Sequence, residues 1–223
     1  MDLHFIFLIV LGIVSLTYLI TLFFKPSPFQ YILKGCLIPL ILAVYLTGAN
    51  VILVPIILAL LFAWAGDILL VKISNLLCFK LGLASFLIGH ICYIAAMFKF
   101  TQPFNFPVLI IGIVIAAVLG IILFRMIKPA KEMKIPVIAY ETAILIMALF
   151  ALQLFLRQSY SPISPETISY FGIYVLAGSI CFVASDTSLA LVTFQKKPFY
   201  VFCMSTYIAA QFLITLGFCR VPV

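Results

Sequence analysis

The chain has 223 residues, of which 66% are hydrophobic and 9% charged, and its formal net charge is +7. Soluble domains contain about 45–50% apolar and about 25% charged residues. This chain therefore lacks the polar coat of a soluble enzyme, a nucleic-acid-binding module or a disulfide-stapled secreted domain. The composition predicts a polytopic α-helical membrane protein, in which basic loops that set the orientation account for the positive charge.

Eight stretches of the chain are long and apolar enough to span a hydrocarbon core, which takes about 20 residues. They cover approximately residues 3–24, 31–47, 51–71, 79–98, 107–124, 135–156, 167–192 and 198–218. The first stretch has no basic n-region and no small-residue cleavage site, so we expect a retained helix and not a signal peptide. Short polar segments separate the stretches. We expect a single transmembrane domain of eight helices over residues 1–223.

The basic residues are concentrated in alternate loops. The first, third, fifth and seventh loops and the adjoining helix ends hold 10 of the 13 Lys and Arg residues: Lys25, Lys34, Lys72, Lys80, Arg125, Lys128, Lys131, Lys134, Lys196 and Lys197. The positive-inside rule places these loops in the cytoplasm and both termini on the opposite side. We therefore expect an integral protein of a bacterial cytoplasmic membrane or of an internal eukaryotic membrane.

A weak internal repeat joins the third and seventh stretches. Ala65-Gly66-Asp67-x-x-Leu70 in the third resembles Ala184-Ser185-Asp186-x-x-Leu189 in the seventh. Stretches four spans apart run in the same direction, so a parallel 4+4 repeat would bring the two motifs together. So short a similarity in an apolar background also arises by chance.

Three acidic residues, Asp67, Glu141 and Asp186, fall inside the predicted spans. An intramembrane acid costs about 2.5–3.5 kcal/mol on the translocon-insertion scale, so such a residue is a functional candidate that faces the bundle interior or a wet cavity. The alternative is a structural hydrogen bond to a neighbouring helix. We favour a functional role for Asp67 and Asp186 and leave both readings open for Glu141.

Other polar residues are predicted at similar depth in the membrane. Lys34, Tyr140 and Tyr207 lie within spans toward the cytoplasmic end, and Gln211 follows Tyr207 by one turn. Under the predicted orientation, the buried polar side chains gather in the cytoplasmic half. This distribution favours a cavity open to that side over a pore through the membrane.

The fourth stretch carries Gly82, Phe86, His90 and Tyr93 at spacings that place them on one helical face. This face is either a packing stripe or the carrier of a functional imidazole. The other histidine, His4, is at the far end of the first stretch, and the six cysteines show no C-x-x-C spacing. We expect neither a metal nor another cofactor.

Two familiar hydrolase signatures are missing from the sequence. No G-x-S-x-G nucleophile elbow is present. The G-x-G-D motif of intramembrane aspartyl proteases fails because Trp64 occupies its first glycine position.

Taken in order, the polar motifs resemble those of the lysoplasmalogenase family of multipass membrane proteins, also called YhhN-like. The matching pieces are Lys34 with Pro39, Gly66-Asp67, Gly82/Phe86/His90/Tyr93, Pro136 with Tyr140, Gly178/Phe182/Ser185-Asp186, and Tyr207/Gln211/Gly217. Each piece is weak by itself, and their order over eight spans is what makes the match specific. Glu141 is not firmly part of the family pattern.

The resemblance implies hydrolysis of the vinyl ether bond of lysoplasmalogens, which gives a fatty aldehyde and glycerophosphoethanolamine or glycerophosphocholine. Protonation of the vinyl ether β-carbon gives an oxocarbenium ion, to which water adds. Two carboxyl groups in different environments can divide these tasks, as in glycoside hydrolysis. We expect Asp67 and Asp186 to be this pair; the sequence does not tell which is the acid.

Supporting roles follow from the same resemblance. His90 is the third predicted catalytic residue, and it would orient water or a carboxyl group together with Tyr140 and Tyr207. Lys34 would meet the substrate phosphate. The predicted substrate-binding residues are Lys34, Tyr93, Tyr140, Tyr207 and Gln211, and the predicted partners are a lysophospholipid and the bilayer.

Two other functions remain open at the level of sequence. A proton-coupled small-solute transporter would also need buried acids, but it predicts polar access from both sides of the membrane. A lipid-binding protein without chemistry would tolerate Asn at both Asp positions.

Overall fold

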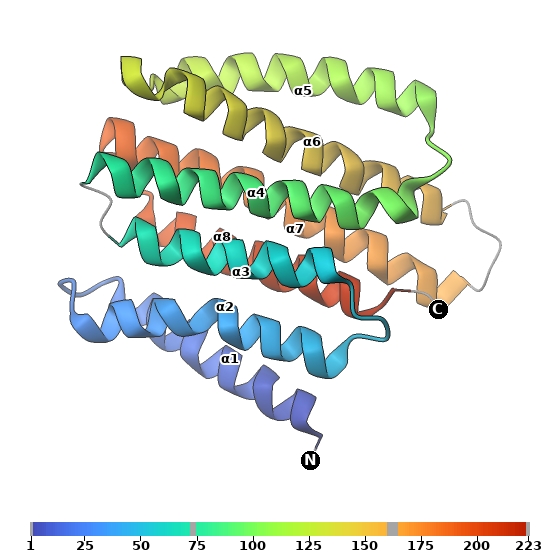
Figure 1. Cartoon of the computed structure of the whole chain (residues 1–223), viewed down its shortest axis with the longest axis horizontal. Helices are drawn as coiled ribbons and strands as arrows, with labels where there is room; N and C mark the ends of the chain where they lie inside the picture. The colour runs from blue at the N-terminus through green and yellow to red at the C-terminus, as the bar shows by residue number, and fades with distance from the viewer. Residues whose placement is uncertain (1, 72–74, 160–164, 222–223) are drawn as a thin grey trace.

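The described part of the chain is almost entirely helical. The computed structural model describes residues 2–71, 75–159 and 165–221, and for residues 158–159 and 165–169 it describes the backbone alone. These residues form eight α-helices and a short 3-10 helix at Lys131–Met133, with no strand among them. The helices are α1 (Leu3–Thr21), α2 (Pro28–Gly48), α3 (Val54–Leu70), α4 (Leu76–Thr101), α5 (Phe106–Ile127), α6 (Lys134–Ser159), α7 (Pro165–Gln195) and α8 (Tyr200–Cys219) (Figure 1). The all-α prediction is confirmed, and each helix overlaps one predicted stretch.

Seven helices within the described residues are long and apolar enough to cross a membrane. The eighth, α3, is also apolar but has only 17 residues, the lower end of the usual spanning range of about 17–25. It begins three residues later than predicted because Leu53 is extended and a proline occupies the first turn. The architecture is that of a polytopic membrane bundle.

Polar side chains next to prolines or short loops start several helices. The Ser27 hydroxyl accepts a hydrogen bond from the Gln30 backbone N–H at 3.3 Å at the start of α2. Asn75 accepts from the backbone N–H groups of Leu77 and Cys78 at the start of α4. These caps satisfy N–H groups that have no partner within the helix, and they fix where each span begins.

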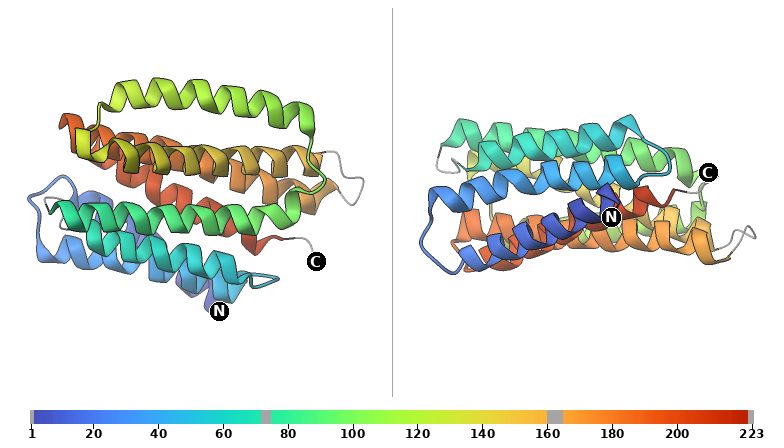
Figure 2. Two further views of the ribbon diagram at one scale, coloured as in Figure 1. Left: turned by 45° about the horizontal axis from the view of Figure 1, so that its top comes forward. Right: turned by 90° about the horizontal axis from the view of Figure 1, so that it is seen from below.

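The helices run alternately up and down, which sorts the connections between them. The α1–α2, α3–α4, α5–α6 and α7–α8 connections lie at one end of the bundle, and both termini lie at the other (Figures 1 and 2). These four connections are the ones predicted to be basic loops. One of their basic residues, Lys72, lies outside the described residues. The cytoplasmic location of that end remains a prediction, and so does the internal repeat.

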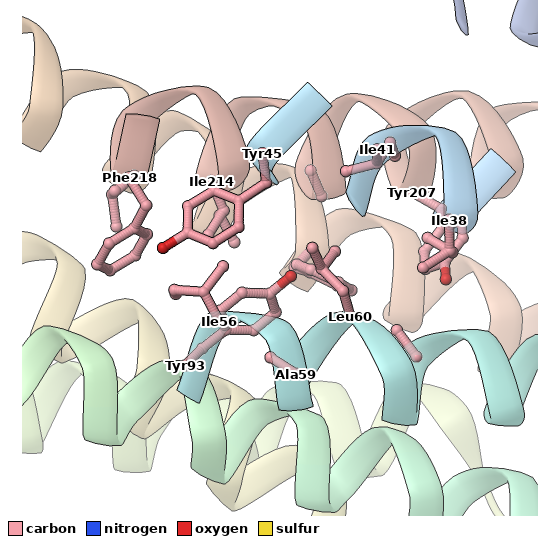
Figure 3. Close-up of a cluster of buried hydrophobic side chains, with 14 of the residues drawn as sticks. Ile38, Ile41, Tyr45, Ile56, Ala59, Leu60, Tyr93, Tyr207, Ile214 and Phe218 are labelled. Carbon is pink, nitrogen blue, oxygen red and sulfur yellow. The ribbon is translucent and has the colours of Figure 1, made fainter. Parts of the chain in front are cut away.

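The main core cluster draws residues from every long helix except α5, and the part between α2, α3, α4 and α8 is shown in Figure 3. Ile38, Ile41 and Tyr45 of α2 meet Ile56 and Leu60 of α3, and all five are at most 1% exposed. Small residues permit close helix contact, as is usual in membrane bundles. A Cβ on Gly178 of α7 would lie 2.9 Å from the Ile214 backbone nitrogen of α8, so these two helices pack almost backbone to backbone.

Helix α5 is the least packed element. It lies at the outer edge of the bundle, against α6 and α7 (Figures 1 and 2). Only Gly112 and Ile127 of its residues are buried. Most of its apolar surface therefore faces the surroundings, as expected for a helix exposed to lipid.

Candidate active site

An ion pair joins α2 to α3 near the end of the bundle that carries the basic loops. Lys34 Nζ lies 3.3 Å from Asp67 Oδ1, and the two side chains are only 9% and 4% exposed. The Tyr207 hydroxyl of α8 donates to Asp67 Oδ2 at 2.6 Å. The carboxyl group of Asp67 thus has a cation on one oxygen and a hydroxyl donor on the other, which offsets the cost of burying it.

A second cluster joins α4, α6 and α7 around Asp186. The Tyr140 hydroxyl donates to Asp186 Oδ2. His90 Nε2 lies 3.0 Å from the Tyr140 hydroxyl oxygen and 3.5 Å from Asp186 Oδ2. The Asp186 side chain is 12% exposed and the His90 side chain 1%, so Asp186 is the member of the cluster that a ligand can reach.

Aromatic rings connect the two clusters. The Phe182 ring of α7 lies edge-on to the His90 ring with centroids 4.9 Å apart, and edge-on to the Tyr207 ring at 5.9 Å. Phe86 contacts the other side of Tyr207, also at 5.9 Å. Phe86 and His90 lie on the helical face of α4 that was predicted from their spacing. This face therefore packs toward both carboxyl groups. The rings keep water from surrounding these polar contacts.

Two of the predicted substrate-binding residues, Tyr93 and Gln211, bind each other and neither aspartate. The Tyr93 hydroxyl donates to Gln211 Oε1 at 2.6 Å, and these residues are 1% and 0% exposed. Neither they nor His90 form part of the walls of the two cavities around Asp186. The geometry gives Tyr93, Gln211 and His90 supporting positions behind the cavity walls.

Asp67 and Asp186 line the same cavity, which has a volume of about 400 Å³. Lys34 and Tyr207 form part of its wall, so the cavity reaches both clusters. This volume lies in the usual range for small-molecule sites, about 300–1,000 Å³. Of the polar residues predicted at similar depth, Lys34 and Tyr207 thus meet both aspartates around one cavity, whereas Tyr140 and Gln211 do not line it.

Three tyrosines in this wall were missed by the sequence analysis. Tyr18 of α1, Tyr31 of α2 and Tyr200 of α8 all line the cavity. Tyr18 is 1% exposed, although it lies in a helix that is otherwise mostly exposed. The only signal in the sequence was a tyrosine inside an apolar stretch, seven residues before Lys25.

A smaller, mostly apolar cavity of about 50 Å³ lies on the other side of Asp186. Tyr140, Glu141 and Asp186 supply most of the polar atoms of its wall. A cavity needs roughly 10–15 Å³ to hold one water molecule, so this space is large enough for a few. Asp186 therefore lines both a ligand-sized cavity and a water-sized one.

Glu141 is buried outside the hydrogen-bond network. It is 8% exposed, and its Oε1 has no hydrogen-bond partner among the described residues. It also lines an apolar groove of about 710 Å³ between α5 and α6. Glu141 thus shares the small cavity with Asp186 but does not line the larger cavity that holds both aspartates.

The described residues contain no group of three His, Cys, Asp or Glu side chains that could hold a metal ion. The polar groups that the site offers are two carboxyl groups, an imidazole, an ammonium group and phenol hydroxyls.

Comparison with known proteins identifies the family. Searches of curated proteins and of solved structures found no match. The model of the YhhN family, which includes lysoplasmalogenases, matches residues 29–218. This match spans α2 to nearly the end of α8 and contains every predicted site residue. The chain belongs to the YhhN family.

Proposed function

We propose that the protein is a lysoplasmalogenase-like hydrolase, which cleaves the vinyl ether bond of a single-chain alkenyl glycerophospholipid. The observation that carries the proposal is the pair of intramembrane carboxyl groups, Asp67 and Asp186, on one ligand-sized cavity. Each is held in a different environment. The family match supports the same reading.

Asp186 is the better placed of the two to act as the acid. Its neighbours are the Tyr140 hydroxyl and the His90 imidazole, whereas Asp67 is paired with an ammonium group. A general acid has to reach the reacting carbon, and the Asp186 side chain is 12% exposed whereas that of Asp67 is 4% exposed. The proton of Asp186 would pass to the β-carbon of the vinyl ether, which leaves an oxocarbenium ion and an aspartate.

Asp67 then suits the second half of the reaction. Its carboxyl group is paired with Lys34 and accepts a hydrogen bond from Tyr207. As a carboxylate it stabilises the oxocarbenium ion and takes a proton from the attacking water. Water adds to the carbon that bears the ether oxygen and forms a hemiacetal. As the hemiacetal collapses, Asp67 gives its proton to the ether oxygen, the bond from that oxygen to the fatty chain breaks, and Asp186 takes the proton of the hemiacetal hydroxyl group. The products are a fatty aldehyde and the headgroup alcohol, which retains the ether oxygen, and both aspartates regain their starting protonation states.

The cavity also suits an amphipathic substrate. Lys34 supplies a positive charge for a phosphate, while Leu70, Phe86 and Leu189 supply apolar wall. His90 is a positioning residue for Asp186 and Tyr140, since it is not part of the cavity wall.

The direct test is aldehyde release by the purified protein in detergent. We expect release from lysoplasmenylethanolamine and none from the saturated alkyl ether of the same chain length, since an alkyl ether has no double bond to protonate. Cleavage of neither lipid by a folded preparation would contradict the proposal. Solute uptake into sealed vesicles without aldehyde release would instead support a proton-coupled transporter.

A further inference from the structure

Helix α2 lacks one backbone hydrogen bond beside the Lys34–Asp67 ion pair. Pro39 lies inside the helix and has no N–H to offer to the carbonyl four residues earlier, which is that of Gly35. The indole N–H of Trp64 in α3 donates to this Gly35 carbonyl at 2.8 Å. A side chain of α3 therefore replaces the missing backbone bond of α2, as a carbonyl group within a bilayer requires.

A hollow of about 290 Å³ lies between α2 and α3 at the same place. We call it the α2–α3 opening; its walls are Tyr31, Lys34, Gly35, Asp67, Ile68 and Val71. Four of these six residues, Tyr31, Lys34, Asp67 and Val71, also line the 400 Å³ cavity. The ion pair thus borders the cavity on one side and the opening on the other.

The outer rim of the opening faces the surface of the bundle. Tyr31, Ile68 and Val71 are 44%, 49% and 38% exposed. Gly35 lies about 10 Å along α2 from the start of the helix, at 1.5 Å per residue, which is a depth inside the hydrocarbon core. A Cβ on Gly35 would meet nothing within 4 Å, so the absence of a side chain here leaves the space empty.

We propose that the hydrocarbon chain of the substrate passes through the α2–α3 opening, so that the lipid reaches the site sideways from the bilayer. The headgroup then occupies the 400 Å³ cavity, and the chain extends past Gly35 into the surrounding lipid. This inference rests on the proposed function. It explains why the cavity can be smaller than a whole lysophospholipid, and why apolar exposed side chains surround a buried ion pair.

The chain offers a matched pair of variants for a test. Gly35→Leu places a side chain in the opening, and Gly12→Leu in α1 is the control, because a Cβ on Gly12 also meets nothing within 4 Å. Both changes raise helix propensity, and Gly35→Leu leaves the carbonyl that Trp64 binds in place. A third variant, Gly120→Leu, fills the competing apolar groove between α5 and α6.

We expect Gly35→Leu to lower kcat/KM for a long-chain lysoplasmalogen by roughly tenfold, which corresponds to about 1.4 kcal/mol of transition-state binding. A short-chain, water-soluble vinyl ether analogue should be cleaved at the wild-type rate. Gly12→Leu and Gly120→Leu should resemble wild type with both substrates. Unchanged long-chain activity in Gly35→Leu would overturn the inference, as would an equal loss for both substrates or a selective loss in Gly120→Leu.

A second measurement separates this inference from the proposed function. A saturated alkyl lysophospholipid with a photoreactive group on its chain is not hydrolysed, so its labelling does not depend on turnover. We expect it to label α2 and α3 around Tyr31, Ile68 and Val71, with labelling lost in Gly35→Leu. Labelling of the α5–α6 groove alone would overturn the opening even if hydrolysis is observed. Labelling at the opening without hydrolysis would overturn only the reaction.

Discussion

The membrane bundle holds buried carboxyl groups in two contrasting regions. On one side, Asp67 and Asp186 each accept a hydrogen bond from a tyrosine hydroxyl and share a ligand-sized cavity. On the other, Glu141 faces the thinly packed α5–α6 side with an unpaired Oε1. All three are acids within predicted spans, and sequence analysis favoured a functional role for Asp67 and Asp186 while it left Glu141 open. The comparison shows that partners and access distinguish a candidate site from an isolated buried carboxyl group.

The largest effect on stability should come from breaking the ion pair. Asp67→Asn leaves the Lys34 ammonium without its partner, and removal of one member of a buried pair costs up to about 3–5 kcal/mol. The double variant Lys34→Met/Asp67→Asn removes both charges, so its unfolding temperature should recover most of the loss while hydrolysis stays abolished. Thermal unfolding in detergent measures the first effect and aldehyde release the second. A double variant less stable than Asp67→Asn would show that the pair is not the stabilising contact.

Removal of the hydroxyl that contacts Asp186 tests the second cluster. Tyr140→Phe keeps the ring and loses the hydrogen bond to Asp186, which becomes negatively charged as its proton leaves. Bonds to charged groups contribute about 1.5–3 kcal/mol. We expect kcat to fall roughly 10- to 150-fold, with little change in KM because Tyr140 positions Asp186 and is not a wall residue of the larger cavity. Steady-state kinetics in detergent measures both kcat and KM. A rise in KM at unchanged kcat would assign Tyr140 to substrate binding instead.

On the α5–α6 side of the bundle, we expect a substitution to raise stability. Glu141→Met fills a similar space and removes a buried Oε1 that has no hydrogen-bond partner among the described residues. Such an unpaired atom typically costs about 1–3 kcal/mol. The variant should therefore unfold at a higher temperature than wild type. A lower unfolding temperature would mean that Glu141 has a stabilising contact beyond those described.

The smallest effect should come from the pair behind the cavity wall. Tyr93→Phe removes a neutral hydrogen bond to Gln211, for which about 0.5–1.5 kcal/mol of stability is typical. Because neither residue lines the cavity, KM for the lipid should stay within the error of measurement. A KM that rises severalfold would restore the substrate-binding role predicted from the sequence.

The sequence predicted the number, order and approximate limits of the helices, because hydrophobic length and short polar breaks determine them locally. Helix α3 was predicted too long, since a proline and an extended Leu53 delay its start. The sequence also predicted which polar residues lie at similar depth. It could not predict which ones touch, for example that Lys34 pairs with Asp67 and Tyr140 with Asp186. Such contacts depend on how helices far apart in sequence face one another.

The placement of His90 and Glu141 shows the same limit. Spacing along α4 placed His90 on one face with Phe86 and Tyr93, but only the packed bundle puts it next to Asp186 and outside the cavity wall. Glu141 follows Tyr140 directly in the chain, yet only Tyr140 is hydrogen-bonded to Asp186, because one helical step of about 100° points the two side chains in different directions. The internal repeat and the cytoplasmic orientation stay predictions.

The central claim is that the partnered aspartates, and not buried acids in general, carry the chemistry. Aldehyde release from lysoplasmenylethanolamine by Asp186→Asn and Glu141→Gln, compared with wild type in the same detergent, tests it most directly. Loss of a general acid lowers a rate by about 10²–10⁴-fold, so we predict a loss of that size for Asp186→Asn and near wild-type turnover for Glu141→Gln. Equal turnover in the two folded variants, or a greater loss in Glu141→Gln, would contradict the account.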